Sequence, residues 1–155
     1  MIVWIGRTLA LAIHDRQLAE HGGGGGVRDD GLLDSALARP QQLGSGPLPR
    51  LRGRVGVGAS AEMGGLADLA ASLAFGLARN HPFVDGNKRT AHVAYRVFIA
   101  LNGGELVASD EEKYVAMLGL AEGSLGETEF ADWLRPRIKA KHSGQVQEKR
   151  AAYRR

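Results

Sequence analysis

The ten residues HPFVDGNKRT, numbers 81–90, combine side chains that can hold a phosphate group and accept a proton. They stand between two apolar, alanine-rich stretches, which indicates a polar loop between two helices. Gly86, Asn87 and Lys88 lie where the second helix begins, and the free N–H groups and partial positive charge of a helix start attract anions. Gly86 allows a close approach of the backbone to phosphate, while Lys88 and Arg89 add positive charge.

Two further residues of this stretch supply what a transfer of phosphate would need. Asp85 directly precedes the anion site and offers the single carboxylate that Mg²⁺ takes together with phosphates and waters. His81 ends the preceding helix, and an imidazole can take a proton from a hydroxyl that attacks a bound nucleotide. We therefore expect transfer of a nucleotide group onto a hydroxyl, with Phe83 pointing inward to pin the loop. Taken singly, the same residues also suit a polar turn with solvated cations.

The rest of the chain predicts the helices that position this loop. Glycines close the first helix in HGGGGG, Pro40 is expected to stop the second, and Ser109 with Glu112 forms a capping box. The third and fourth helices are apolar on more than one face, which predicts a central, buried pair. LRGRVGVG alternates weakly and favours a small hairpin or flap near 50–58. The predicted fold is all-α, with helices over 8–20, 31–40, 61–79, 87–102, 110–123 and 127–137.

Composition predicts one domain over residues 1–136 and a basic tail over 137–155. The chain of 155 residues has a net charge of +3, and from Arg135 onward it has eight Lys or Arg and one acid, Glu148. Only Tyr153 interrupts the charges of the tail with an aromatic ring, so a solvated end is favoured over a nucleic-acid binding segment. The chain has no cysteine, which excludes disulfides and thiolate metal sites and suits a cytoplasmic location.

Membrane association is not predicted from the sequence. The apolar start MIVWIGRTLALAIHD is interrupted by Arg7 and lacks a small-residue cleavage site, so a mature helix is favoured over a signal peptide. No apolar run approaches the roughly 20 residues of a membrane span.

The motif and its surroundings resemble the Fic/Doc family. HPFVDGNKRT matches the Fic signature at every defined position, and HDRQLAEHGG, VRDDGLLDSALARP, FIALNGGEL and FADWLR are similar to the death-on-curing (Doc) branch of bacterial toxins. The resemblance covers roughly 9–43 and 66–135. It implies the helical Fic/Doc fold, with His81 as general base, Asp85 as Mg²⁺ ligand and ATP phosphates on Gly86, Asn87, Lys88 and Arg89.

The resemblance also implies which group is transferred. Adenylylating Fic enzymes carry Gly at the place of Lys88 and a second Arg at the place of His92, whereas the Doc branch has Lys and lacks that Arg. This favours transfer of the γ-phosphoryl group to a hydroxyl of a target protein, a threonine of elongation factor Tu in Doc toxins, which arrests translation. Adenylyl transfer is the alternative.

The sequence also bears on regulation and on functions of another class. The inhibitory Ser/Thr-x-x-x-Glu-Gly/Asn helix of some Fic proteins is absent, because Leu118 precedes Glu122 by four positions. A separate antitoxin is therefore expected. An inactive Fic fold that only binds is a further alternative, and a metal hydrolase is disfavoured because the histidines lack paired ligand spacing. His14 and His92 are expected to be structural or to line the site.

Overall fold

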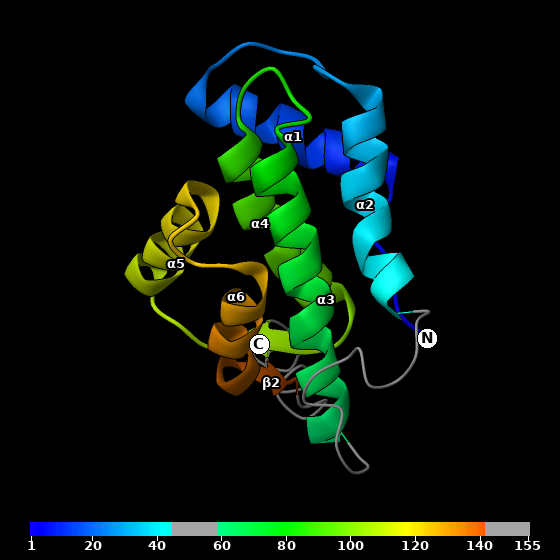
Figure 1. Cartoon of the computed structure of the whole chain (residues 1–155), viewed down its shortest axis with the longest axis vertical. Coiled ribbons are helices and arrows are strands. Elements are labelled where there is room, and N and C mark those ends of the chain that lie inside the picture. The colour runs from blue at the N-terminus through cyan, green and yellow to red at the C-terminus, as the bar shows by residue number, and fades with distance from the viewer. Residues whose placement is uncertain (45–58, 142–155) are drawn as a thin grey trace, which may run out of the picture.

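A computed structural model describes residues 1–44 and 59–141, the side chains of 59–62 excepted. These residues form a mainly helical fold, as predicted (Figure 1). A short antiparallel sheet joins β1 to β2. The elements in chain order are α1 (Arg7–His21), α2 (Asp30–Gly44), α3 (Ala59–Asn80), α4 (Asn87–Leu101), β1 (Gly104–Leu106), α5 (Asp110–Glu122), α6 (Glu127–Leu134), the 3₁₀ turn η2 (Arg135–Arg137) and β2 (Ile138–Ala140).

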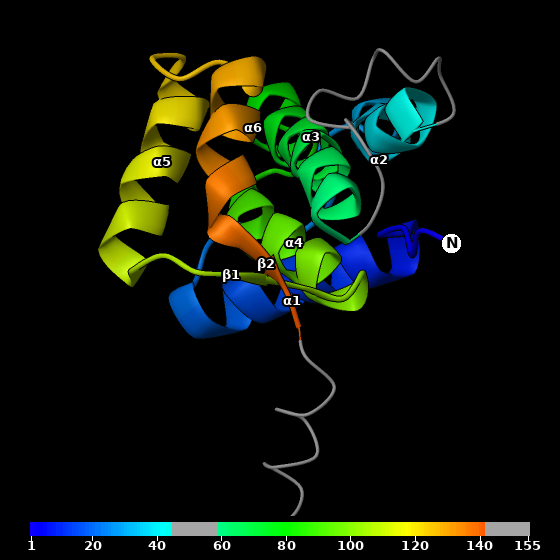
Figure 2. The ribbon, with the colours of Figure 1, turned by 90° about the horizontal axis from the view of Figure 1, so that it is seen from below.

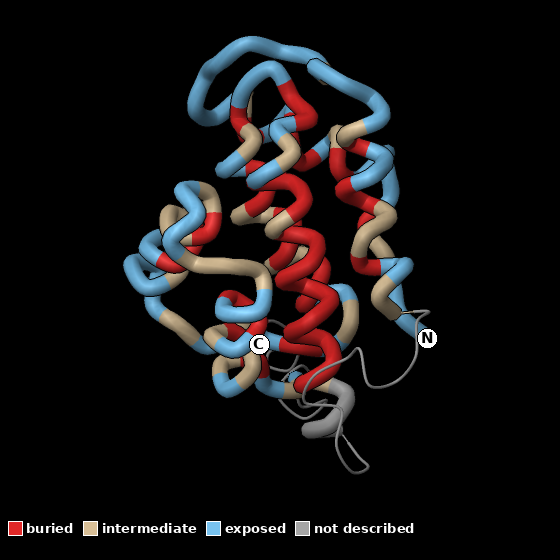
Figure 3. Tube along the Cα trace, viewed as in Figure 1, coloured by how far each residue is buried: buried red, intermediate tan, exposed pale blue. Residues whose placement is uncertain are grey.

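Helix α3 forms the centre of the molecule. It is buried along most of its described length in Figure 3, and α2, α4 and α6 pack against it. Its leucines Leu66, Leu69, Leu73 and Leu77 are all buried. Helix α4 packs the buried side chain of Tyr95, and the buried residues on either side of it, against this core. The predicted central pair is therefore confirmed, and the motif loop joins its two members at one end of the fold (Figure 1).

Helix α2 does not stop at Pro40, contrary to the sequence-based expectation. Pro40 lies inside the helix and is buried, and the helix continues to Gly44. A proline removes one helical hydrogen bond, which favours an end at this point. Packing outweighs that loss: Leu43 packs against the core, and the indole of Trp4 covers Gly44, where an added Cβ would lie 3.0 Å from the ring.

The buried faces of α1 and α4 include several alanines, whereas some of the leucines of these helices are exposed. Leu9 and Leu101 are exposed at the surface. The buried positions include Ala10, Ala91 and Ala94 instead. Alanine lets two helices approach closely, but it contributes little to a hydrophobic pattern. A prediction based on large apolar residues therefore places the buried face of the helix about one residue away from its actual position.

The small sheet was not predicted. β1 and β2 are antiparallel, with Glu105 paired with Lys139 and Leu106 paired with Ile138. Ile138 is buried, so β2 fastens the end of the described chain to the core. Figure 2 shows the two strands running close to α4. The hairpin predicted near 50–58 lies outside the described residues.

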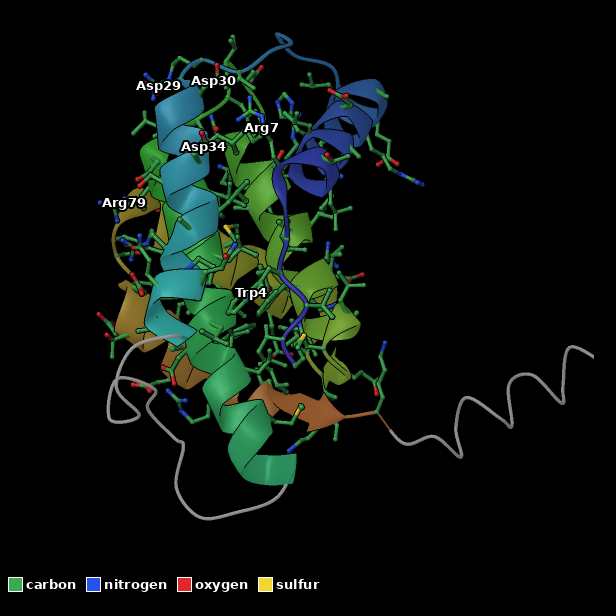
Figure 4. All side chains as sticks on the ribbon, turned by 90° about the vertical axis from the view of Figure 1, so that its right-hand side faces the viewer. Trp4, Arg7, Asp29, Asp30, Asp34 and Arg79 are labelled. Carbon is green, nitrogen blue, oxygen red and sulfur yellow. The ribbon has the colours of Figure 1, made fainter. Side chains whose placement is uncertain are left out.

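Local signals at the helix ends behave as expected. Ser109 and Glu112 form the reciprocal capping box of α5, and Asp29 accepts the N–H of Leu32 at the start of α2. Arg7 of α1 forms ion pairs with Asp30 and Asp34 of α2, and Figure 4 shows the three side chains directed toward one another. None of the helices among the described residues has the length and apolarity that a membrane crossing requires.

Gly76 controls how closely α2 approaches α3. A Cβ at Gly76 would lie 3.1 Å from the Cα of Ala36 and from Cδ of Arg39. We expect Gly76→Val to lower the free energy of unfolding by about 1–3 kcal/mol, because the extra carbons press on the backbone of α2. Urea unfolding measures this change.

Gly65 is the control in the same helix, since a Cβ there would meet no atom of the described residues within 4 Å. Gly65→Ala should raise stability by about 0.5–1 kcal/mol through helix propensity alone. A Gly76→Val protein as stable as the parent would contradict the close packing of α2 on α3.

Candidate active site at the start of helix α4

The end of α3 is held by an arginine from the α1–α2 connection. Arg28 donates from Nε to the carbonyl of His81 at 2.8 Å and from Nη2 to the carbonyl of Asn80 at 3.0 Å. These are carbonyls that a helix end leaves without partners. His81 follows the last helical residue, as predicted, with φ of 51°, a left-handed value that costs energy in a residue with a side chain. Its side chain is exposed.

Phe83 fixes the middle of the motif loop. Its ring is buried and stacks on the imidazole of His14, with the ring centres 3.8 Å apart and the planes at 7°. Its backbone forms a β-bridge with Val27. Asn87 accepts the N–H of Phe83 at 2.8 Å with Oδ1 and donates to its carbonyl at 3.0 Å with Nδ2. The predicted inward position of Phe83 is confirmed, and the Asn87 side chain is used inside the loop.

Helix α4 begins with an open set of backbone donors. Gly86 is its N-cap, with φ of 77°, and no side chain caps the helix. The N–H groups of residues 87–89 have no acceptor within a helix of this geometry. Lys88 and Arg89 are exposed beside them, and Nη1 of Arg89 reaches the carbonyl of Gly22 at 3.5 Å. Backbone donors and two cations therefore share one helix end.

Asp85 is an exposed carboxylate directly before this helix end. Its Oδ1 accepts the N–H of Gly86 at 2.8 Å, and its main-chain oxygen lies 2.8 Å from Nε2 of His14, which must donate because a carbonyl only accepts. Within the described residues no group of three or more His, Cys, Asp or Glu could hold a metal. A single carboxylate beside an anion site fits Mg²⁺, which takes its remaining ligands from phosphates and water.

His92 lies one turn further along α4 and is half-buried. Burial is the main cause that lowers its pKa to about 4; the positive charges of Arg96 and Lys113 add to this effect, and the carboxylate of Asp110 opposes it. Its Nδ1 is buried and has no hydrogen-bond partner among the described residues. His92 is therefore neutral near pH 7 and cannot replace the charge of an arginine.

The structure brings Asp85, Gly86, Lys88 and Arg89 together at one helix end and places His81 at the opposite end of the same loop. Sequence reasoning missed the positioning role of Arg28. The only feature of the sequence that could have indicated this role is the position of the arginine in VRDD. Nothing in the local sequence shows that this segment contacts the end of a helix about fifty residues away. His14 was expected to be structural or to line the site, and its hydrogen bond to Asp85 agrees.

The chain is similar in sequence to known proteins. It belongs to the Fic/Doc family, whose sequence profile matches residues 4–99. This confirms the resemblance inferred from the motif.

Two relatives show the extent of the similarity. Toxin Doc of Mycolicibacterium smegmatis (strain ATCC 700084 / mc(2)155) is 46% identical over 84 residues, which are 53% of this chain and 53% of that protein. Protein kinase doc of Escherichia phage P1 is 30% identical over 125 residues, which are 81% of this chain and 87% of that protein. The match to the first relative thus spans about half of each chain.

The lowered pKa of His92 predicts a pH-dependent stability. Its folded-state pKa of about 4 lies below the unfolded value of 6.5, so the unfolded chain binds the proton more tightly between these values. The contribution of neutral His92 is fully present above pH 6.5 and is lost as the pH falls toward 4. The free energy of unfolding in urea should fall between pH 7 and pH 5. This fall should be smaller for His92→Gln than for the parent.

The comparison separates His92 from other groups that titrate in this range. His81→Gln removes an exposed histidine by the same substitution and is therefore the matched control. An equal loss of stability in the parent and in His92→Gln would contradict the assignment.

Proposed function

We propose that this chain is a Doc-like toxin that transfers the γ-phosphoryl group of ATP to a hydroxyl of a target protein. The observation that carries the proposal is the open start of α4, where backbone donors, Lys88 and Arg89 lie next to the carboxylate of Asp85. A triphosphate needs such donors, and it needs a cation between its own charge and that of Asp85.

The charges at this helix end support a bound divalent cation. The carboxylate of Asp85 accepts a hydrogen bond from Gly86, the N-cap of α4, so one negative charge already lies at the positive end of the helix dipole. A phosphate at the same place would be repelled by the carboxylate without a positive ion between them. Mg²⁺ supplies this charge when bound, with Asp85 as its protein ligand.

His81 is the proposed general base. The hydroxyl oxygen of the target bonds to the γ-phosphorus, the bond from that phosphorus to the β–γ bridging oxygen breaks, and ADP leaves. The hydroxyl proton goes to the imidazole of His81. The exposed side chain and the left-handed backbone, held through its carbonyl by Arg28, suit a base that must meet a protein substrate.

The motif favours phosphoryl over adenylyl transfer. Lys88 stands where adenylylating relatives have glycine, and His92, neutral near pH 7, stands where they have a second arginine. An ATP bound in the orientation used for adenylyl transfer would therefore lack one cationic contact to its terminal phosphates. A nucleotide bound in the reverse orientation would place its phosphate tail at the start of α4, beside Lys88. The phage relative that bears the name protein kinase agrees with this choice.

The proposed target is a threonine of elongation factor Tu, which the resemblance to the Doc branch suggests, so that the protein would act in the cytoplasm and arrest translation. Restraint would come from a separate antitoxin. The sequence that inhibits some Fic proteins from within is absent, and Glu122, the one glutamate followed by glycine, is exposed at the end of α5.

Labelled nucleotides test the proposal directly. The protein is incubated with Mg²⁺, purified elongation factor Tu and ATP carrying label at either the α- or the γ-phosphorus. Label should reach the target from γ-labelled ATP only. His81→Ala should slow this transfer by about 100- to 10,000-fold, the usual contribution of a general base.

His81→Gln serves as a second variant, because glutamine keeps a polar side chain but cannot accept the hydroxyl proton near neutral pH. Both variants should unfold at the same urea concentration as the parent, apart from a small change due to backbone strain. Transfer of α-label would establish adenylyl transfer instead. Undiminished transfer by both variants would remove His81 from the chemistry, and no transfer from either nucleotide to elongation factor Tu would contradict the proposed target.

A further inference from the structure

Gly23, in the run of five glycines after α1, lies against the carboxylate of Asp85. A Cβ built on Gly23 would be 2.6 Å from Oδ2 of Asp85 and 3.2 Å from its Cγ, closer than carbon and oxygen atoms can pack without displacement. The same Cβ would lie 3.2 Å from Cδ2 of Leu18. The φ of Gly23 is +125°, so a residue with a side chain would also be strained there.

The carboxylate has little freedom to move away from such a side chain. Its Oδ1 accepts the N–H of Gly86, and its main-chain oxygen accepts a hydrogen bond from the buried His14. Oδ2 has neither a hydrogen bond nor an ion pair within the described part of the chain. The side of Asp85 that faces Gly23 thus holds the oxygen that remains available.

The glycine run is itself attached to the motif loop on both sides of this contact. Gly26 accepts the N–H of Val84 at 3.1 Å, and the carbonyl of Gly22 lies within reach of Arg89. Its backbone is therefore held beside Asp85, and Gly23 cannot move outward without breaking those contacts.

We propose that Gly23 is a positioning residue for the metal ligand: by having no side chain, it leaves Oδ2 of Asp85 in place and open to a divalent cation. The inference rests on the proposed function, in which Asp85 binds Mg²⁺. It adds a specific requirement to that function, namely that residue 23 must be glycine for the carboxylate of Asp85 to keep its position.

The neighbouring glycines provide matched controls for the substitution Gly23→Ala. A Cβ at Gly25 would meet only Cδ1 of Leu18, at an ordinary 3.9 Å, and its φ lies outside the left-handed range. Gly26 has a φ of +98°, but within the described part of the chain a Cβ there would meet no atom within 4 Å. Gly25→Ala therefore has neither a close contact nor strain, and Gly26→Ala has strain without a close contact.

Electron paramagnetic resonance can measure the affinity for Mn²⁺ in the presence of ADP. This tests the effect of Gly23→Ala on the metal site without requiring catalysis. Gly23→Ala should weaken Mn²⁺ binding by about 10- to 100-fold, as loss of the groups that orient a metal ligand usually does. Gly25→Ala should bind Mn²⁺ like the parent. Gly26→Ala should be less stable and yet retain the Mn²⁺ affinity.

Asp85→Ala separates a failure of this inference from a failure of the proposed function. If Asp85→Ala weakens Mn²⁺ binding and Gly23→Ala does not, only the role of Gly23 is wrong. If Asp85→Ala leaves Mn²⁺ binding unchanged, Asp85 is not the metal ligand, and the proposed role of Gly23 is then wrong as well. Equal weakening by Gly23→Ala and Gly25→Ala would also overturn the inference.

A double-mutant cycle tests the contact itself by stability alone. The strain at residue 23 is the same in both backgrounds and cancels, so Gly23→Ala should cost less stability in Asp85→Ala than in the parent. Should Gly23→Ala fail to fold, recovery of folding in the double variant would support the inference. Additive effects, or a double variant that also fails to fold, would overturn it.

Discussion

The position of Phe83 is the constraint on which the motif loop depends. Its ring is buried against His14 of α1, its backbone bridges Val27, and the side chain of Asn87 binds both its N–H and its carbonyl. Each contact comes from a different part of the chain, so the loop is held from α1, from the α1–α2 connection and from α4. The polar residues on either side of Phe83 are therefore placed by the core.

This arrangement explains why so many polar groups can remain at the surface between two buried helices. Arg28 satisfies the last carbonyls of α3, and Gly86 allows α4 to begin with its N–H groups open. Asp85 then adds a negative charge at a helix end that would otherwise attract only anions. A site of this kind is suited to a cation and a phosphate together, which is what a magnesium nucleotide presents.

Helix positions and the motif loop could be predicted from the sequence because they depend on local patterns. The apolar period of α3, the capping box of α5 and the order of residues in HPFVDGNKRT are all readable without a fold. Contacts between distant segments could not be predicted. The arginine at position 28 bonds a carbonyl 53 positions away along the chain, and the glycine at position 23 lies against a carboxylate 62 positions away. Pro40 remains in a helix because of what packs around it. The β1–β2 pair also joins distant segments, which is why no local signal indicated it.

The central claim is that the start of α4 receives the phosphates of a magnesium nucleotide. Nuclear magnetic resonance of the ¹⁵N-labelled protein, titrated with ATP and Mg²⁺, tests it directly, because each backbone N–H is observed separately. The account predicts that the largest shifts occur in the amides of Gly86, Asn87, Lys88 and Arg89 and that they saturate together. Shifts concentrated in the basic segment that follows Arg135, with the amides of residues 86–89 unchanged, would contradict it.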